Sequence, residues 1–185
     1  MTVVIGAISG NDVWLAGDSY CGDEDISELC AEPKVFTVSN TVALGISGDV
    51  RAEILTTKAI KKIIKNREKV TQEWLKTDFS LKLHDALKDT GVLKEKNSIH
   101  TLEDSSFVLA HAARLYYLDD NLGLWRPQTP YVAIGSGRSL ALGALAYADA
   151  NCDLENYPKE SLREILNCVS KHCHYVRPPY TFVKI

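Results

Sequence analysis

The chain has 185 residues, of which 45% are hydrophobic and 24% are charged. This length fits a single domain over residues 1–185, with enough apolar material to bury a sizeable core. The 21 basic and 24 acidic side chains give a formal net charge of −3, which argues against a nucleic-acid binder and a polybasic membrane anchor. No apolar run reaches the roughly 18 residues of a membrane span, and no basic segment precedes the apolar start, so we expect a cytoplasmic protein.

The first 48 residues are predicted to form β-strands. Residues 2–8 are rich in β-branched side chains, which favour strands, and turn residues separate them from a second apolar run at residues 13–16. These two runs predict a hairpin. An acidic loop follows, and residues 34–38 and 41–47 predict a second hairpin around the turn Ser39-Asn40.

Two helices are predicted in the middle of the chain. Apolar residues recur near the 3.6-residue period from Val50 to Lys65, and Asp49 precedes them as an N-cap residue. A second helix is expected from about residue 72 to residue 90, with Gly91 as its C-terminal cap.

The second half of the chain repeats this order of strands and then helices. Its expected strands are residues 106–110, 115–118, 131–134 and 180–183, and its expected helices are residues 139–150 and 158–170. Runs of strands followed by pairs of helices indicate layered antiparallel sheets with helices on their outer faces. A doubly wound parallel sheet is not expected, because strands and helices do not alternate one by one.

The cysteines match no zinc or disulfide framework. They are Cys21, Cys30, Cys152, Cys168 and Cys173. In a reducing cytoplasm we expect free thiols, although Cys21 and Cys30 flank the acidic loop and could pair on oxidation.

A metal or nucleotide site is not indicated. His172 and His174 could converge near the start of a strand, but a zinc ion there would need ligands from elsewhere in the chain. The chain also lacks a phosphate-binding loop and a dinucleotide fingerprint, so we expect no metal and no cofactor.

Thr2 is a candidate nucleophile. A small second residue permits removal of Met1, which would leave Thr2 with a free α-amine. The hydroxyl of an N-terminal threonine can attack a carbonyl while its own amine, with an unperturbed pKa of about 7.7–8.0, accepts the proton. Alone, Thr2 is weak evidence, because many proteins begin with Met-Thr and the residue can simply be the first of a strand.

Four motifs in register resemble proteasome β subunits and HslV-type peptidases, in the N-terminal nucleophile hydrolase superfamily. The first joins Thr2-Val-Val-Ile-Gly-Ala to the Ala-Gly-Asp that ends at Asp18, and Lys34 follows without a gap at the place of the essential lysine. The others are the run Thr41-Val-Ala-Leu-Gly-Ile-Ser-Gly48 and the Ile-Gly-Ser-Gly around Ser136. The resemblance covers nearly the whole chain and implies an α+β fold: a four-layer αββα sandwich of two stacked antiparallel sheets with helices on both outer faces.

The resemblance also implies a role for each of these positions. Thr2 would be the nucleophile, Lys34 would lower the pKa of its hydroxyl, and Asp18 would orient Lys34. The Gly48 N–H would stabilise the oxyanion and Ser136 would bond near the Thr2 amine. The residues implied to bind the substrate are Ile46, under an apolar specificity pocket, and Tyr20.

Two positions depart from the family pattern. Lys171 stands where the family has an aspartate that helps to hold the threonine, and His174 stands where it has a serine. Two hypotheses follow. In the first, the chain is a threonine peptidase in a homo-oligomeric ring that acts on peptides or unfolded proteins, with a separate ATPase unfoldase as its partner. In the second, it is a catalytically inert structural or assembly subunit of the same fold. In both hypotheses residues 50–65 and 72–90 would supply contacts between subunits.

Overall fold

The computed structural model describes residues 2–22, 25, 27–96, 99–102 and 104–185. Its strands are β1 (Val3–Ser9), β2 (Asp12–Gly17), β3 (Tyr20–Gly22), β4 (Ser27–Leu29), β5 (Val35–Ser39), β6 (Val42–Ser47), β7 (Lys94–Lys96), β8 (Ile99–Thr101), β9 (Ser106–His111), β10 (Leu115–Leu118), β11 (Leu124–Trp125), β12 (Tyr131–Gly135) and β13 (Thr181–Lys184). Its helices are α1 (Val50–Lys65), α2 (Gln72–Leu87), α3 (Arg138–Ala150), α4 (Asp153–Asn156) and α5 (Pro158–His172).

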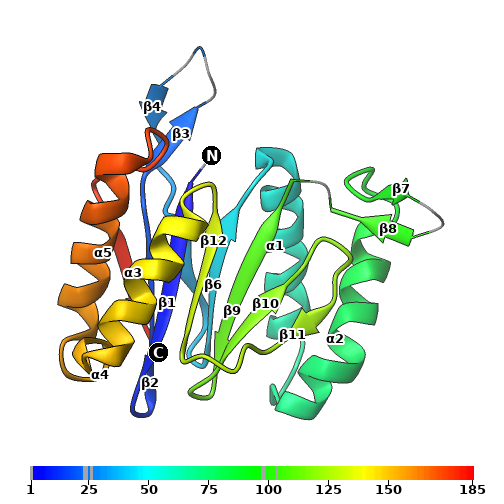
Figure 1. Ribbon diagram of the computed structural model, residues 1–185. Coiled ribbons are helices and arrows are strands. Elements are labelled where there is room, and N and C mark those ends of the chain that lie inside the picture. The colour runs from blue at the N-terminus through cyan, green and yellow to red at the C-terminus, as the bar shows by residue number, and fades with distance from the viewer. Residues whose placement is uncertain (1, 23–24, 26, 97–98, 103) are drawn as a thin grey trace.

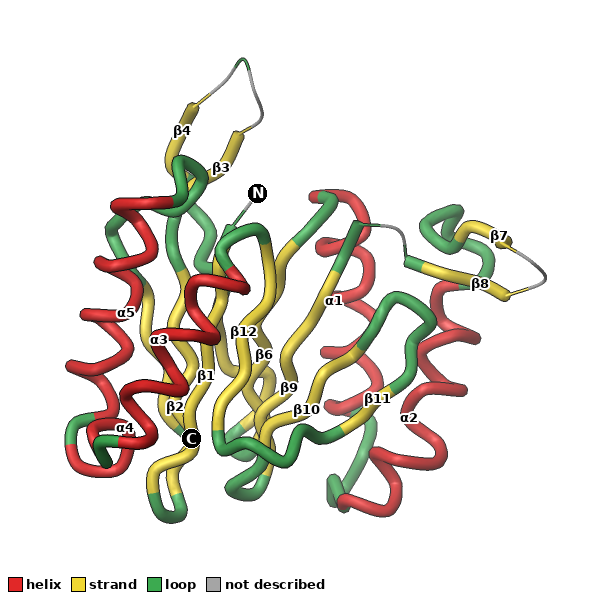
Figure 2. Tube along the Cα trace, in the orientation of Figure 1, coloured by secondary structure: helices red, strands yellow, loops and turns green. Residues whose placement is uncertain are grey.

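Two antiparallel sheets form the centre of the molecule. One has the strand order β12-β1-β2-β13, and the other has the order β11-β10-β9-β6-β5. Helices α3, α4 and α5 cover the outer face of the first sheet, and α1 and α2 cover the outer face of the second (Figures 1 and 2). This arrangement is the four-layer αββα sandwich expected from the sequence.

Three apolar layers hold the four layers together, and β1 shows how one strand serves two of them. Val3, Ile5 and Ala7 point to the layer under α3 and α5, whereas Val4 points to the layer between the sheets. This alternation follows from the period of two along a strand, so a strand covered on both faces is apolar at every position. The third layer lies between the second sheet and α1 and α2.

A glycine lets the sheets approach closely near the start of β1. A Cβ atom placed on Gly45 of β6 would lie 2.6 Å from Cγ1 of Val4. A larger residue would therefore push β6 away from β1 at the end of the sandwich where the chain begins.

Several local predictions differ from the structure. The acidic loop contains the short hairpin of β3 and β4, and a second short hairpin, β7 and β8, follows α2. Helix α2 ends at Leu87, before a turn that leads to Gly91 at φ +73°. His172 is the last residue of α5 and does not lie near the start of a strand, because the helical pattern continues through the last turn.

Among the described residues, no helix is both long enough and apolar enough to cross a lipid bilayer.

Candidate functional site

Asp18 is the centre of a buried polar cluster at one end of the two sheets. Its Oδ1 atom accepts hydrogen bonds from the Thr2 hydroxyl, from the Val3 N–H at 2.9 Å and from Lys34 Nζ at 3.0 Å. The side chain of Asp18 is fully buried and that of Lys34 nearly so, and they form an ion pair. One carboxylate oxygen therefore joins the hydroxyl and the ammonium that the sequence analysis singled out.

The second oxygen of Asp18 is held by backbone groups. Oδ2 accepts from the Tyr20 N–H at 2.9 Å and from the Arg177 N–H at 3.3 Å. The carbonyl of Tyr20 in turn accepts a hydrogen bond from Lys34 Nζ. Buried charges are tolerated when they are paired and hydrogen-bonded, and these contacts meet that condition.

Thr2 is fixed from its other side by the turn between β12 and α3. Its N–H donates to Ser136 Oγ at 3.2 Å, and its carbonyl accepts from the Ser136 hydroxyl at 3.1 Å and the Gly137 N–H at 3.3 Å. Gly135 has φ +91°, and a Cβ atom there would lie 2.3 Å from the Thr2 carbonyl oxygen. Only glycine fits that place without moving Thr2.

The sheet topology explains why these distant residues meet. Val3 pairs with Gly135 across β1 and β12, while Val4 pairs with Gly17 across β1 and β2. Thr2 and the last residues of β12 and β2 therefore lie at the same end of the sandwich, where β6 also leads into α1 (Figure 1). Lys34 directly precedes β5. Its carbonyl accepts a hydrogen bond from the Ile46 N–H of the neighbouring strand β6 at 2.9 Å.

Gly48 forms the turn between β6 and α1. It has φ +145°, and a Cβ atom on it would lie 2.2 Å from the Asp104 carbonyl oxygen. Asp49, the next residue, donates its N–H to Ser105 Oγ at 3.3 Å and caps α1 by accepting from the Ala52 N–H at 2.9 Å. The turn is thus held by packing on one side and by a helix cap on the other.

Glu53, which the sequence analysis missed, bears on the same turn. The Gly48 N–H is close enough to its carboxyl group to lower the pKa of that group. Burial raises the pKa of the Glu53 carboxyl to about 7, although Lys34 and the Gly48 N–H favour its ionised form. Glu53 lies in the first turn of α1, where an acidic residue is ordinary, so only the fold reveals this contact.

The two residues predicted to bind substrate lie beside the cluster. Ile46 is half-buried and packs against the apolar layer under α1 and α2. Tyr20 is 3% exposed, its ring meets Tyr175 edge to face at 5.7 Å, and the guanidinium of Arg177 lies over it. Tyr20 therefore contributes its backbone groups to the cluster, while its ring is covered.

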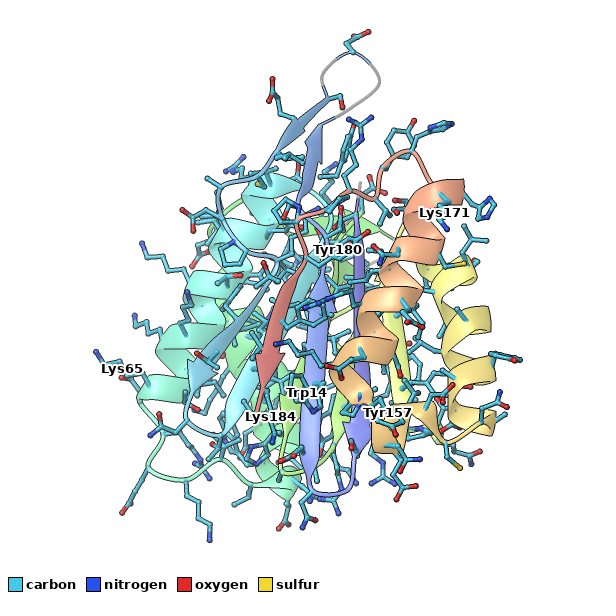
Figure 3. All side chains as sticks on the ribbon, turned by 90° about the vertical axis from the view of Figure 1, so that its left-hand side faces the viewer. Trp14, Lys65, Tyr157, Lys171, Tyr180 and Lys184 are labelled. Atoms are coloured by element: carbon cyan, nitrogen blue, oxygen red, sulfur yellow. The ribbon has the colours of Figure 1, made fainter. Side chains whose placement is uncertain are left out.

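The two positions that depart from the family pattern are exposed. Lys171 lies in the last turn of α5 and His174 lies in the turn that follows (Figure 3). The segment after α5 reaches Asp18 through the Arg177 N–H.

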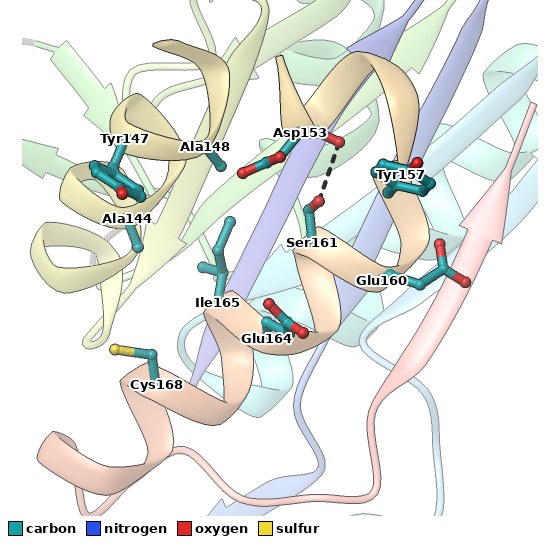
Figure 4. Close-up of a pocket in the computed structure, with 10 residues that line it drawn as sticks. All are labelled: Ala144, Tyr147, Ala148, Asp153, Tyr157, Glu160, Ser161, Glu164, Ile165 and Cys168. Atoms are coloured by element: carbon teal, nitrogen blue, oxygen red, sulfur yellow. Dashed lines mark hydrogen bonds between the residues drawn. The ribbon is translucent and has the colours of Figure 1, made fainter. Parts of the chain in front are cut away.

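A separate cavity of about 510 Å³ lies between α3, α4 and α5 (Figure 4). Tyr147 and Tyr157 stand at its sides, with the acidic side chains of Asp153, Glu160 and Glu164 around it. No residue of the cluster around Asp18 lines it. It is a surface feature of the helical layer, distinct from the site that contains Thr2.

Comparison with solved structures identifies the fold. HslV from Trypanosoma brucei matches 99% of this chain and 98% of its own, with a TM-score of 0.72 at 18% identity. The chain has the fold of HslV. Thiobacillus denitrificans BPH matches 100% of this chain and 97% of its own, with a TM-score of 0.75 at 15% identity, and the structure of BPH in complex with epoxomicin matches equally well. No family model and no curated protein matches the sequence.

Proposed function

We propose that the chain is a threonine-type peptidase of the HslV and proteasome β kind, with Thr2 as its nucleophile after removal of Met1. The observation that carries the proposal is the convergence of the Thr2 hydroxyl and Lys34 Nζ on one oxygen of Asp18. This convergence brings a weak nucleophile and the Lys34 side chain to the same carboxylate oxygen in a buried setting, where a nearby cation favours the ionised form of a hydroxyl.

The proposed reaction has two stages. The Thr2 oxygen attacks the carbonyl carbon of a peptide, and the hydroxyl proton passes to the Thr2 amine. The C–N bond breaks, the proton moves to the leaving amine, and water then hydrolyses the ester on Thr2. Ser136 is within hydrogen-bond distance of the Thr2 nitrogen and would keep it oriented, while the Gly48 N–H would hold the oxyanion.

The substitution of Thr2 tests the proposal directly. Turnover of a fluorogenic peptide with an apolar P1 residue should be nearly abolished in Thr2→Ala, with a loss on the order of 10⁶-fold. Thr2→Ser keeps the hydroxyl and is the matched control, which should retain a measurable part of the activity. Intact mass must show loss of Met1 in all three proteins. Equal turnover in wild type and Thr2→Ala would refute the proposal.

Lys34→Ala separates the chemistry from the assembly. It should abolish turnover, because the ammonium that faces the hydroxyl is lost, and it should leave the size of the assembly unchanged by light scattering. Epoxomicin, which one of the matching structures contains, supplies a second measurement. It should raise the melting temperature of the processed wild type and leave that of Thr2→Ala unchanged.

The proposed assembly is a homo-oligomeric ring that admits unfolded chains, and a separate ATPase would have to supply any unfolding. Large apolar side chains are exposed on α1 and α2, among them Ile54 and Leu81, and would be covered by subunit contacts. A monomer at micromolar concentration by light scattering would contradict this part of the proposal.

A second candidate function, an inert subunit of the same fold, is favoured by one observation. The Gly48 N–H, which the reaction needs for the oxyanion, also interacts with the buried Glu53 carboxyl, which would compete for it. Two results together would support the inert subunit. Met1 would be retained in cells with normal methionine aminopeptidase, and the melting temperature would be the same with and without epoxomicin.

A further inference from the structure

Two cysteines lie on the short hairpin next to the site, outside the proposed reaction. In β3 and β4, Cys21 pairs with Glu28 and Tyr20 pairs with Leu29. The pairing continues by one residue before β3 and after β4, because the Cys30 N–H donates to the Ser19 carbonyl at 2.7 Å. Cys30 therefore lies opposite Ser19, and Ser19 is two residues before Cys21 in the chain.

This register places both thiols on one face of the hairpin. Residues two apart on a strand share a face, and so do directly opposed residues. Cys21 and Cys30 are thus diagonal neighbours. The neighbouring Cys30 thiol is the largest of the influences that raise the pKa of the Cys21 thiol, as expected for two thiols close together. Both are free thiols and both are partly exposed, so a small reagent can reach them.

The thiol pair is connected to the polar cluster through Tyr20. The Tyr20 carbonyl accepts from Lys34 Nζ, and its N–H donates to Asp18, so both backbone groups of the residue before Cys21 hold charged partners. Cys30 and burial raise the pKa of the Cys21 thiol, and the positive charge of Lys34 opposes that rise. A displacement of Cys21 would therefore be passed to the two charged groups that surround the Thr2 hydroxyl.

We propose that Cys21 and Cys30 are a modification site, a dithiol that a low-molecular-weight disulfide such as oxidised glutathione converts into an intramolecular disulfide. The Cys30 thiolate attacks one sulfur of the reagent, forms a mixed disulfide and releases one reagent thiolate. The Cys21 thiolate then attacks Cys30 Sγ and releases the second. Two protein thiols are oxidised, one reagent disulfide is reduced to two thiols, and the two protons pass to them.

Closure changes the position of Tyr20. A disulfide requires Cβ atoms about 3.5–4.5 Å apart, whereas diagonal neighbours across an antiparallel pair are more widely spaced. Closing the bond draws Cys21 toward Cys30 and shifts the adjoining Tyr20 carbonyl relative to Lys34 Nζ. A displacement of about 1 Å in a catalytic group can cost on the order of a hundredfold in rate. This effect on turnover rests on the proposed peptidase function, whereas the disulfide itself does not.

Trypsin offers a direct measurement of the disulfide. Lys34 is the first basic residue in the chain, so the peptide that ends there contains Cys21 and Cys30 and no other cysteine. After incubation of the full chain with oxidised glutathione and alkylation of the remaining thiols, this peptide should lose two hydrogens and take up no alkyl group. Cys168, exposed on α5, should instead carry glutathione, which shows that the reagent acted.

Variants test whether the two cysteines act together. Cys21→Ser and Cys30→Ser should each leave one thiol, and the peptide should then carry a single glutathione. A wild-type peptide that stays reduced or carries glutathione on either cysteine would overturn the proposal, and this result needs no variant to fold.

Turnover is the second measurement. Oxidised wild type should lose roughly tenfold or more of its peptidase turnover and regain it with dithiothreitol. Cys21→Ser should show no such loss. Formation of the disulfide with unchanged turnover would overturn the connection to Lys34. Absence of turnover in the reduced protein would count against the proposed function, and the mass of the peptide would still decide the disulfide.

Discussion

The two sides of the proposed site are built in opposite ways. The nucleophile side, made of Thr2, Asp18, Lys34 and Ser136, is buried, and five donors meet the carboxylate of Asp18. The glycine-turn side, made of Gly48, Asp49 and Glu53, holds its central N–H against a carboxyl whose pKa is about 7. The nucleophile side is thus fixed by the fold, whereas the state of the glycine-turn side depends on one proton. Substitution of Asp18 should be costly at any pH, whereas substitution of Glu53 should be mild and depend on pH.

The largest effect is expected from Asp18→Asn. The variant leaves the buried Lys34 ammonium without its counter-ion and places an amide N–H among five donors, so the free energy of unfolding should fall by about 3–5 kcal/mol. Asp12→Asn is the matched control, because Asp12 pairs with Lys184 at 2.7 Å on the surface. It should cost less than about 1 kcal/mol. Urea unfolding of both variants measures the difference, and equal losses would remove the distinction between the two sides.

Gly135→Ala should come next. Its Cβ atom would collide with the Thr2 carbonyl oxygen, and φ +91° is strained for any L residue, so we expect a loss of about 2–3 kcal/mol and of peptide turnover. Gly143→Ala, in the open middle of α3, should instead stabilise the chain by about 0.5–1 kcal/mol. A Gly135→Ala variant as stable as wild type would show that Thr2 is not held by this turn.

Glu53→Gln should change stability only above a certain pH. The folded-state pKa is raised from 4.5 to about 7, so the folded chain binds more protons and loses stability as pH rises between these values. Glutamine does not titrate. The variant should therefore match wild type near pH 4.5 and exceed it by roughly 1–2 kcal/mol at pH 8, after allowance for solvent screening. A difference that does not vary with pH would contradict the buried carboxyl.

The smallest effect is expected from Asp49→Ala, which removes the N-cap of α1. A lost cap costs about 1 kcal/mol, and Thr71→Ala, which removes the cap of α2 at Trp74, should cost about the same. Asp49 is next to Gly48 and Thr71 is not, so peptide turnover should fall in the Asp49→Ala variant and stay unchanged in the Thr71→Ala variant. Equal turnover in the two variants would mean that the start of α1 does not position the glycine turn.

The sequence predicted the elements whose period is unambiguous. Residues 2–8 and 13–16 read as a hairpin, and residues 50–65 read as a helix, because apolar side chains follow the spacing of each element closely. The hairpin of β3 and β4 was missed, since its three-residue strands are too short and too polar to show a period. Helix α2 was predicted three residues too long. Residues 88–90 form a turn before Gly91, and their helix propensities do not distinguish this turn from a last helical turn.

The site was harder to predict than the fold. The resemblance singled out Thr2, Asp18, Lys34 and Ser136, which the structure brings together. Glu53 and Arg177 carry no such signal: one is an ordinary acidic residue at the start of a helix, and the other contributes only a backbone N–H. Contacts of this kind depend on tertiary packing, which no local pattern encodes.

The pairing of β1 with β12 limits the time in which the peptide bond before Thr2 can be cleaved, a cleavage that the proposed function requires. In the finished fold Thr2 is 2% exposed, so an aminopeptidase has little access to that bond. The partner of Val3 is Gly135, which leaves the ribosome more than a hundred residues later. At roughly 5–20 residues per second, this delay leaves several seconds in which the nascent amino end is still open to the processing enzyme. Removal of Met1 would therefore take place during translation, and a chain that folds before this removal would keep Met1.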